Sequence, residues 1–190
     1  MYSGCATGAS LSAGNFVFLG PLMSPVSKIF LVSSFLVLAF AASAKAQVAL
    51  DSVQLRNTKG KMVSYASVRG GAPLVLVCFW SINSETSLRE LTAISQQYAK
   101  LKRPLAFTLL ALCVDQGNLL SHMRNTSLEN EWAFDVYADV NGDLQKAFHY
   151  TNPPLSLIVD KGEVVYQQSG FEPGTEQYLF SRIQSLAAGK

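Results

Sequence analysis

Two apolar segments separated by one helix-forming segment constrain this chain more than any other feature. Residues 74–80 are apolar throughout, and residues 105–114 form a second, almost entirely apolar run. Such runs, rich in β-branched and aromatic residues, are typical of strands buried on both faces. Between them, a predicted helix places Arg89, Glu90 and Lys100 away from an apolar face made of Leu88, Leu91, Ile94, Tyr98 and Leu101. The order strand, helix, strand predicts a parallel pair joined by a right-handed crossover.

The remaining segments predict shorter elements on either side of this unit. Residues 53–55 and 62–65 flank Lys59-Gly60 and are expected to form a hairpin, as are residues 155–159 and 164–167. Helical or strand patterns also cover 119–128 (helix), 134–137 (strand), 143–150 (helix) and a closing helix capped by Thr175. The layout predicts one α/β domain over residues 47–190, with a mixed central sheet and helices on both faces.

Residues 1–46 differ in composition from the rest of the chain. They contain no Asp or Glu, and Lys28 precedes an apolar run at 29–42 that is followed by Ala44-Lys45-Ala46. A cationic start, a short apolar stretch and a small-x-small site are typical of a secretory signal. The run is shorter than the about 20 residues that a membrane span needs. We therefore expect translation to start at Met23 and cleavage near Ala46, with a retained membrane anchor as the alternative.

Charge and ligand patterns argue against two classes of function. Lys28 and Lys45 are the only charged side chains of residues 1–46, so the other 13 of the 15 basic side chains balance the 13 acidic ones. A neutral domain without a basic run has little with which to bind a nucleic-acid backbone. Residues 139–143 resemble a calcium loop, but Tyr137 and Phe148 stand where its first and last ligands would be. We predict that the domain binds no nucleic acid, metal or cofactor.

Several short motifs, in order along residues 47–190, carry a resemblance to a known family. Phe79-Trp80 is followed by a three-residue loop and a helix start, and Pro153-Pro154 precedes the last hairpin. The other residues that contribute to the resemblance are Gly60, Glu90, the 139–142 turn, Asp160-Lys161-Gly162 and Gly170. The chain resembles the thioredoxin-fold superfamily, most closely its TlpA/ResA-like branch of extracytoplasmic thiol-disulfide proteins. This resemblance implies a thioredoxin-like three-layer fold with an N-terminal β-hairpin.

The chain departs from this family at the reactive atoms. The family carries Cys-x-x-Cys at the helix start, and aligning Phe79-Trp80 puts Ser84 and Ser87 at the two cysteine positions. A helix N-terminus lowers the pKa of a thiol, but two hydroxyls cannot store two electrons as a covalent bridge. We expect Ser84 to be an N-cap and neither degenerate position to be catalytic. A Ser84 nucleophile with His149 as its base is the alternative at this site.

Cys78 and Cys113 are the only cysteines of residues 47–190, and both fall within predicted central strands. Cys78 occupies a position where the family commonly has Asp or Asn. A thiol among Val, Leu and Phe behaves as a small apolar side chain, so we expect both thiols to be buried and inert. An internal disulfide and a displaced redox pair are the alternatives.

The double proline defines a candidate binding surface. Pro154 matches the cis-proline of the family, and we expect a cis bond there. In the family, the residue before this proline pairs through its backbone with an extended peptide; here Pro153 has no N–H to donate. The candidate binding residues are Trp80, Ile82, Asn83, Pro153, Pro154 and Leu155.

The sequence thus predicts an exported, redox-inactive thioredoxin-like protein that is a non-catalytic binding or assembly module in the periplasm or cell envelope of a bacterium. The expected partner is another envelope or secreted protein or an extended peptide, with membrane contact only through an uncleaved N-terminus. The alternative is a thiol-disulfide oxidoreductase of cell redox homeostasis that uses Cys78 or Cys113. A structural subunit of a larger envelope complex is a third hypothesis.

Overall fold

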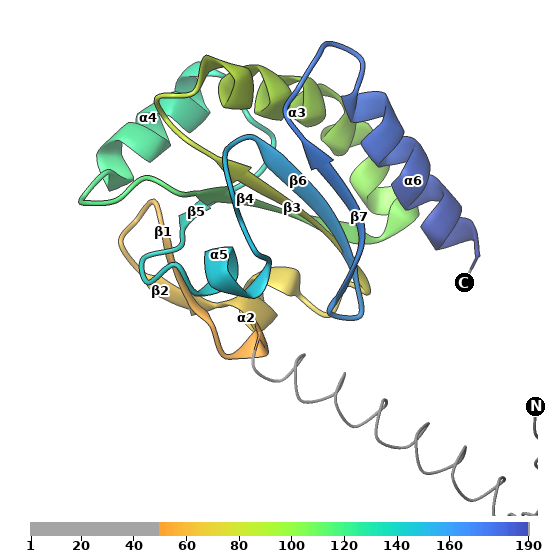
Figure 1. Cartoon of the computed structure of the whole chain (residues 1–190), viewed down its shortest axis with the longest axis horizontal. Coiled ribbons are helices and arrows are strands. Elements are labelled where there is room, and N and C mark those ends of the chain that lie inside the picture. The colour runs from red at the N-terminus through yellow and green to blue at the C-terminus, as the bar shows by residue number, and fades with distance from the viewer. Residues whose placement is uncertain (1–49, 190) are drawn as a thin grey trace, which may run out of the picture. The chain divides into compact units, whose positions relative to one another are not determined.

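A computed structural model describes residues 50–189 of the chain (Figure 1). The expected signal segment, with its start at Met23 and its cleavage site near Ala46, lies outside the described residues. Within residues 50–189, no helix combines the length and the apolar character that a membrane crossing requires.

A mixed sheet of seven strands, in the order β2-β1-β5-β4-β3-β6-β7, forms the centre of the described part. The central strands β3, β4 and β5 are parallel, whereas β6 is antiparallel to β3, and β7 to β6. The strands are β1 (Gln54–Asn57), β2 (Met62–Ser64), β3 (Leu74–Trp80), β4 (Phe107–Cys113), β5 (Val136–Ala138), β6 (Leu155–Asp160) and β7 (Glu163–Ser169). The crossover from β3 to β4 and both predicted hairpins are confirmed.

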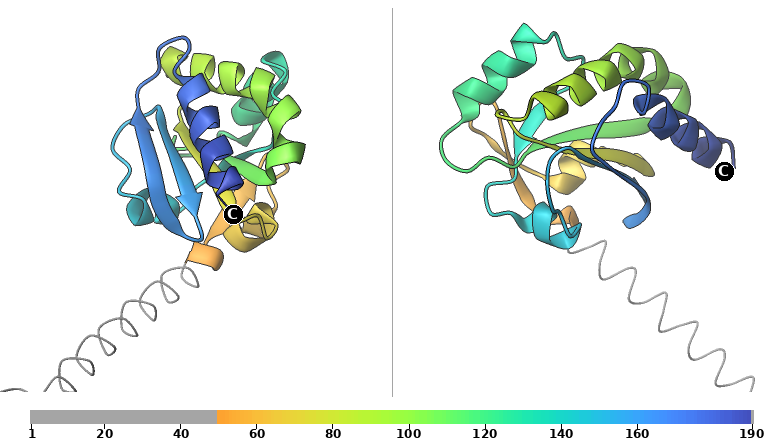
Figure 2. Two further views of the ribbon diagram at one scale, coloured as in Figure 1. Left: turned by 90° about the vertical axis from the view of Figure 1, so that its right-hand side faces the viewer. Right: turned by 45° about the horizontal axis from the view of Figure 1, so that its top comes forward.

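Helices cover both faces of the sheet (Figure 1). One face carries α3 (Glu85–Leu105), α4 (Leu120–Glu129) and α6 (Glu176–Ala188), and the other carries α2 (Tyr65–Arg69) and α5 (Asp143–Ala147). The left view of Figure 2 shows α3 and α6 side by side, in agreement with their direct contact. The predicted α/β class, with a mixed sheet, helices on both faces and an N-terminal hairpin, is confirmed.

The side chains of β3 divide the core into two clusters because successive side chains point to opposite faces. Leu74, Leu76, Cys78 and Trp80 face α3, α4 and α6, and Val75, Val77 and Phe79 face α2 and α5. Every residue of β3 is buried, which explains why its sequence shows no polar alternation. Its end at Trp80 therefore positions the following loop on a rigid strand.

Several local predictions differ from the structure. The helix predicted at residues 143–150 ends at Ala147, and the strand predicted at 134–137 spans Val136–Ala138. Leu105 was expected to begin the second strand, but it ends α3, and Ala106 turns the chain at φ 48° before β4 begins at Phe107. The short helix α2 was not predicted; the Ser64 side chain caps it by accepting from the N–H of Ser67. Thr175 occupies the N-cap position of α6, but its hydroxyl donates to the Glu172 carbonyl and does not cap the helix.

Candidate functional site

The N-terminus of α3 begins four residues after the end of β3, at Ser84. Ser84 Oγ accepts from the N–H of Ser87 at 3.2 Å, and the Ser84 carbonyl accepts from the N–H of Leu88 at 3.1 Å. The bond to Ser84 Oγ satisfies the Ser87 N–H, which a helix start otherwise leaves free, and the bond to the Ser84 carbonyl is the first of the helix, so Ser84 is an N-cap, as predicted. The start of α3 therefore carries a capping hydroxyl.

Ser87 is fully buried in the first turn of α3. Its backbone N–H is used by the cap, but its Oγ has no hydrogen-bond partner in the described structure. A buried hydroxyl without a partner costs stability and does not contribute to it. Ser87 Oγ is therefore a buried hydroxyl that forms no hydrogen bond with a base among the described residues.

Asp115 fixes the loop between β3 and α3, and the sequence analysis missed this role. Its Oδ1 accepts from Ser81 Oγ at 2.8 Å, and its Oδ2 accepts from the N–H of Ile82 at 2.7 Å. Ser81 Oγ in turn accepts from the N–H of Asn83 at 3.2 Å. The only available signal was an acidic residue just beyond a long apolar strand. Hydrogen bonds to Asp115 and one bond within the loop thus hold residues 81–83 in place.

A buried polar group of three residues lies beneath this loop. Ser156 Oγ is 3.3 Å from Cys78 Sγ and 3.0 Å from Glu90 Oε1. All three residues are fully buried, so the expectation that Glu90 points away from the core is wrong. Cys78 does not behave only as a small apolar side chain, because the Ser156 hydroxyl lies within hydrogen-bond distance of both Cys78 and Glu90. Burial raises the pKa of Glu90 to about 7, so this carboxyl is partly neutral near neutral pH.

Both cysteines are free thiols buried in neighbouring strands. Cys78 is paired in register with Ala111, and Cys113 with Trp80, so the two cysteines are offset by two residues along the sheet. Burial, reinforced by the nearby Glu90 carboxyl, raises the pKa of Cys78 far above the usual range of a thiol. Burial also raises the pKa of Cys113 to about 12. Neither thiol stands at a helix N-terminus, where a thiolate would be stabilised.

The peptide bond between Pro153 and Pro154 is cis, as predicted. The six predicted binding residues, however, are not all accessible. Trp80 is 0% exposed and packs edge-on against Trp132 at 5.1 Å, and Leu155 is 1% exposed. Pro154 is also buried, while Ile82 and Pro153 are partly exposed and Asn83 is exposed. The accessible part of the predicted binding surface is therefore Ile82, Asn83 and Pro153, because Trp80, Pro154 and Leu155 are buried.

The structure does not bring Ser84 and His149 together. His149 is exposed and lines a cavity with Gly162 and Val164. No hydrogen bond joins Ser84 to a histidine within residues 50–189, so the described geometry offers no serine nucleophile with its base.

A metal centre finds no support in the described part either. Within residues 50–189, no three His, Cys, Asp or Glu side chains gather in a way that could hold a metal ion. Asp139, in the segment that resembles a calcium loop, accepts from the N–H groups of Asp143 and Gln145 at 3.0 and 2.8 Å. Its carboxylate is therefore used to cap α5.

Comparisons with known proteins agree with this architecture. Residues 46–170 match the model of the AhpC/TSA family. None of the curated proteins compared with the chain matches it. Among solved structures, an uncharacterized thioredoxin-like protein from Porphyromonas gingivalis is 29% identical, with a TM-score of 0.62 over 73% of this chain and 92% of that one.

Two further structures have lower identity and support the fold alone. A putative thiol:disulfide interchange protein DsbE from Chlorobium tepidum is 20% identical, with a TM-score of 0.60 over 70% of this chain and 92% of that one. The bacterioferritin comigratory protein of Xanthomonas campestris, studied for alkyl peroxide reduction, is 14% identical, with a TM-score of 0.61 over 74% and 95%. The described part of the chain therefore has a thioredoxin-like α/β fold.

Proposed function

Since the chain belongs to the AhpC/TSA family and has a thioredoxin-like fold related to thiol-disulfide oxidoreductases, we propose that it is a member without redox activity. On this proposal it is a non-catalytic binding or assembly module, exported to the cell envelope. The cationic and apolar pattern of residues 28–46 supports export.

One observation carries the proposal: hydroxyls occupy the start of α3, and both described thiols are buried away from any helix start. Thiol-disulfide exchange needs an accessible thiolate. Burial raises the pKa of Cys113 to about 12, so this thiol is almost entirely protonated at pH 7. Cys113 is also only 1% exposed, so a substrate disulfide could not reach even this small fraction.

The remaining accessible surface supports a role in binding. Asn83 is exposed at the tip of a loop that Asp115 holds rigid, and Ile82 and Pro153 are partly exposed beside it. A preorganised loop pays little entropy when a partner binds. Because Pro153 has no N–H, an extended peptide could pair with it only through the Pro153 carbonyl. The proposed partner is another envelope or secreted protein that offers such a segment.

Turnover in an insulin-reduction assay tests the redox part of the proposal. We expect no activity above a protein-free control for the native chain, and a gain of activity for the double variant Ser84→Cys with Ser87→Cys. The gain is expected because the start of α3 would lower the pKa of a thiol at position 84. Native turnover that Cys78→Ser or Cys113→Ser abolishes would overturn the proposal.

A photo-crosslinking residue at Asn83 tests the binding part. We expect a discrete crosslinked partner when the variant is expressed in its native cells, because this side chain is exposed on the proposed surface. The same residue placed at Glu129, an exposed position at the end of α4, is the matched control. Identical crosslinking from both positions, or none from Asn83, would contradict a binding role for this loop.

One observation favours a second candidate, a thiol-disulfide oxidoreductase that uses Cys113. Cys113 Sγ lies 3.4 Å from Asp115 Oδ2, the same oxygen that holds the Ile82 N–H. Release of this loop would therefore uncover the thiol. Turnover that rises in Asp115→Ala and disappears on adding Cys113→Ser would favour this candidate.

A further inference from the structure

The hairpin of β1 and β2 meets the start of α4 in a part of the surface that is rich in basic side chains. Residues 52–84 and 116–128, which include these elements, contain no Asp or Glu. The structure brings the two segments together, because a Cβ atom on Gly60, in the turn of the hairpin, would lie 3.8 Å from Leu120 Cδ1. The sequence alone does not show this juxtaposition, because the hairpin and α4 lie far apart along the chain.

The strands of the hairpin place a cation beside an exposed apolar side chain. Leu55 points into the core on the side of α2 and α5. Its neighbour Arg56 therefore points to the side of the sheet that α4 covers, and so does Met62, the residue paired with Arg56 on β2. Met62 is 41% exposed, since β2 is the edge strand of the sheet.

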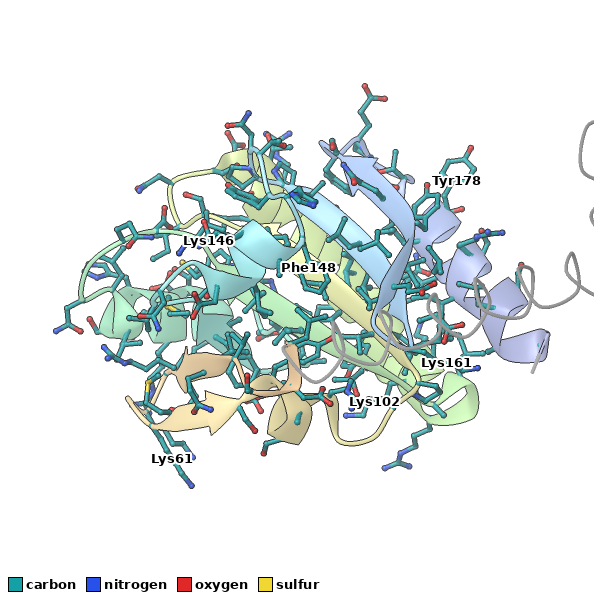
Figure 3. All side chains as sticks on the ribbon, turned by 60° about the horizontal axis from the view of Figure 1, so that its bottom comes forward. Lys61, Lys102, Lys146, Phe148, Lys161 and Tyr178 are labelled. Atoms are coloured by element: carbon teal, nitrogen blue, oxygen red, sulfur yellow. The ribbon has the colours of Figure 1, made fainter. Side chains whose placement is uncertain are left out.

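The turn of the hairpin holds two lysines close to Arg56. Asn57 Oδ1 accepts from the N–H of Lys59 and from the N–H of Lys61, each at 3.0 Å. Both lysines are exposed, and the side chain of Lys61 points away from the domain (Figure 3). A fixed backbone thus presents three cations within residues 56–61.

The helix α4 adds a fourth cation and a second exposed apolar side chain. Arg124 is exposed and follows Leu120 by one helical turn, so it lies on the side of α4 that meets the hairpin. Leu128, one turn further along, is 65% exposed. We call this area the hairpin–α4 surface; it consists of Arg56, Lys59, Lys61, Met62, Arg124 and Leu128.

The positive charge of the hairpin–α4 surface is not neutralised by ion pairs. Within residues 50–189, none of its four cations forms an ion pair, whereas three other cations of the domain do. Asp139 follows the residue of β5 that is paired with Arg56, but it is only 3% exposed, and its carboxylate accepts from two backbone N–H groups of α5. The surface is therefore positive, although basic and acidic side chains balance over residues 47–190.

We propose that the hairpin–α4 surface binds the face of an anionic lipid bilayer. Its four cations meet the lipid phosphates, and Met62 and Leu128 enter the headgroup region. A bilayer face fits better than an acidic protein, because long, separate Lys and Arg side chains around exposed apolar ones need no partner of complementary shape. The inference goes beyond the proposed function and depends neither on redox inactivity nor on the loop of residues 81–83.

Co-sedimentation of the full-length protein with lipid vesicles tests the proposal. One set of vesicles is phosphatidylcholine alone, and the other is an equal mixture of phosphatidylcholine and the anionic phosphatidylglycerol. We expect stronger binding to the anionic vesicles, by about fivefold for each cation that comes near the lipid surface, and a loss of this difference at high salt. Residues 1–49 are the same in every variant, so comparisons between variants isolate the contribution of the hairpin.

Matched variants locate the binding surface. Lys59→Gln with Lys61→Gln should weaken binding to the anionic vesicles about 25-fold. Lys100→Gln with Lys102→Gln, which removes the same charge near the end of α3, should change it less than about twofold. Met62→Gln keeps the charge but removes the apolar contact, so it should weaken binding about three- to fivefold.

Circular dichroism of the same samples reports whether each variant stays folded. Equal binding of the native protein to the two kinds of vesicle would overturn the proposal, as would equal losses in the hairpin double variant and its α3 control. Binding to poly-L-glutamate without binding to anionic vesicles would indicate an acidic protein as the partner and would also overturn it.

Discussion

The hydroxyl of Ser84 at the start of α3 and the thiol of Cys78 in the core have opposite surroundings. At the start of α3, Ser84 is partly exposed and its hydroxyl caps the helix. Beneath it, Cys78 is fully buried and shares the Ser156 hydroxyl with the carboxyl of Glu90. The helix dipole thus acts on an atom that does not ionise, and burial holds the ionisable thiol neutral. The comparison shows that a hydroxyl occupies the exposed start of α3, whereas the nearby thiol is enclosed in the core.

The largest expected difference between the two regions is in stability. Trp80→Ala should lower the free energy of unfolding by about 3–5 kcal/mol, because it removes a fully buried ring that packs on Trp132. Asn83→Ala, three residues further on and exposed, should change it by less than about 0.5 kcal/mol. Urea denaturation followed by circular dichroism measures both. Equal effects would mean that Trp80 faces solvent after all.

Glu90 should make stability fall as the pH rises. Its folded pKa, about 7, lies above its ordinary value of 4.5, so the folded state keeps a proton that the unfolded chain releases. The stabilisation is complete below about pH 4.5 and is lost as the pH rises to about 7, for a total of roughly 3 kcal/mol. Urea denaturation across this range should show this slope in the native protein.

Two variants isolate the contribution of Glu90 to that slope. Glu90→Gln, which cannot ionise, should remove it, whereas Glu129→Gln, at an exposed position, should leave it in place. A slope that persists unchanged in Glu90→Gln would show that another group is responsible.

The errors in predicting these two regions have physical causes. The strand at residues 74–80 could be predicted because a strand buried on both faces leaves a continuous apolar run. The prediction that Glu90 lies outside the core follows from its charge alone. Its position in the sequence indicates the opposite, since Ser87, Glu90, Leu91 and Ile94 follow the spacing of one helix face and all four are buried. The prediction that Trp80 is a binding residue does not anticipate its burial. A sequence does not show whether a helix covers the side chain at the end of a strand.

The role of Asp115 could not be predicted, because it depends on a contact with Ile82 across 33 residues of sequence. No local pattern records which loop a carboxylate will meet once two parallel strands have paired. The cap at Ser84, in contrast, depends on the N–H of Ser87 only three residues away, and such a local pattern is visible in the sequence.

Asp115→Ala should cause the next largest loss of stability, because Asp115 holds the loop of residues 81–83. The carboxylate accepts from Ser81 Oγ and the Ile82 N–H, and losing bonds to a charged group costs about 1.5–3 kcal/mol. The control Glu129→Ala, at an exposed position, should stay within about 0.5 kcal/mol. Hydrogen exchange at the Ile82 amide should accelerate in Asp115→Ala; an unchanged rate would show that the loop is held by other contacts.

Substitution of Ser84 and of Ser87 should change the stability in opposite directions and by the smallest amounts. Ser84→Ala removes the cap and should cost about 1 kcal/mol. Ser87→Ala removes a buried hydroxyl that has no partner, so it should be neutral or stabilise by up to about 1 kcal/mol. Thermal unfolding of the two variants side by side distinguishes them. A loss of stability in Ser87→Ala would mean that its hydroxyl has a partner in solution.

Redox inactivity requires that no reagent can reach the sulfurs of Cys78 and Cys113 in the folded protein. Alkylation with iodoacetamide, followed by peptide mass spectrometry, reports Cys78 and Cys113 separately. We predict that both stay unmodified in the native protein over a period in which the urea-unfolded chain is fully alkylated, since both are buried and burial raises the pKa of each. Alkylation of either cysteine in the native protein as fast as in the unfolded chain would contradict this account.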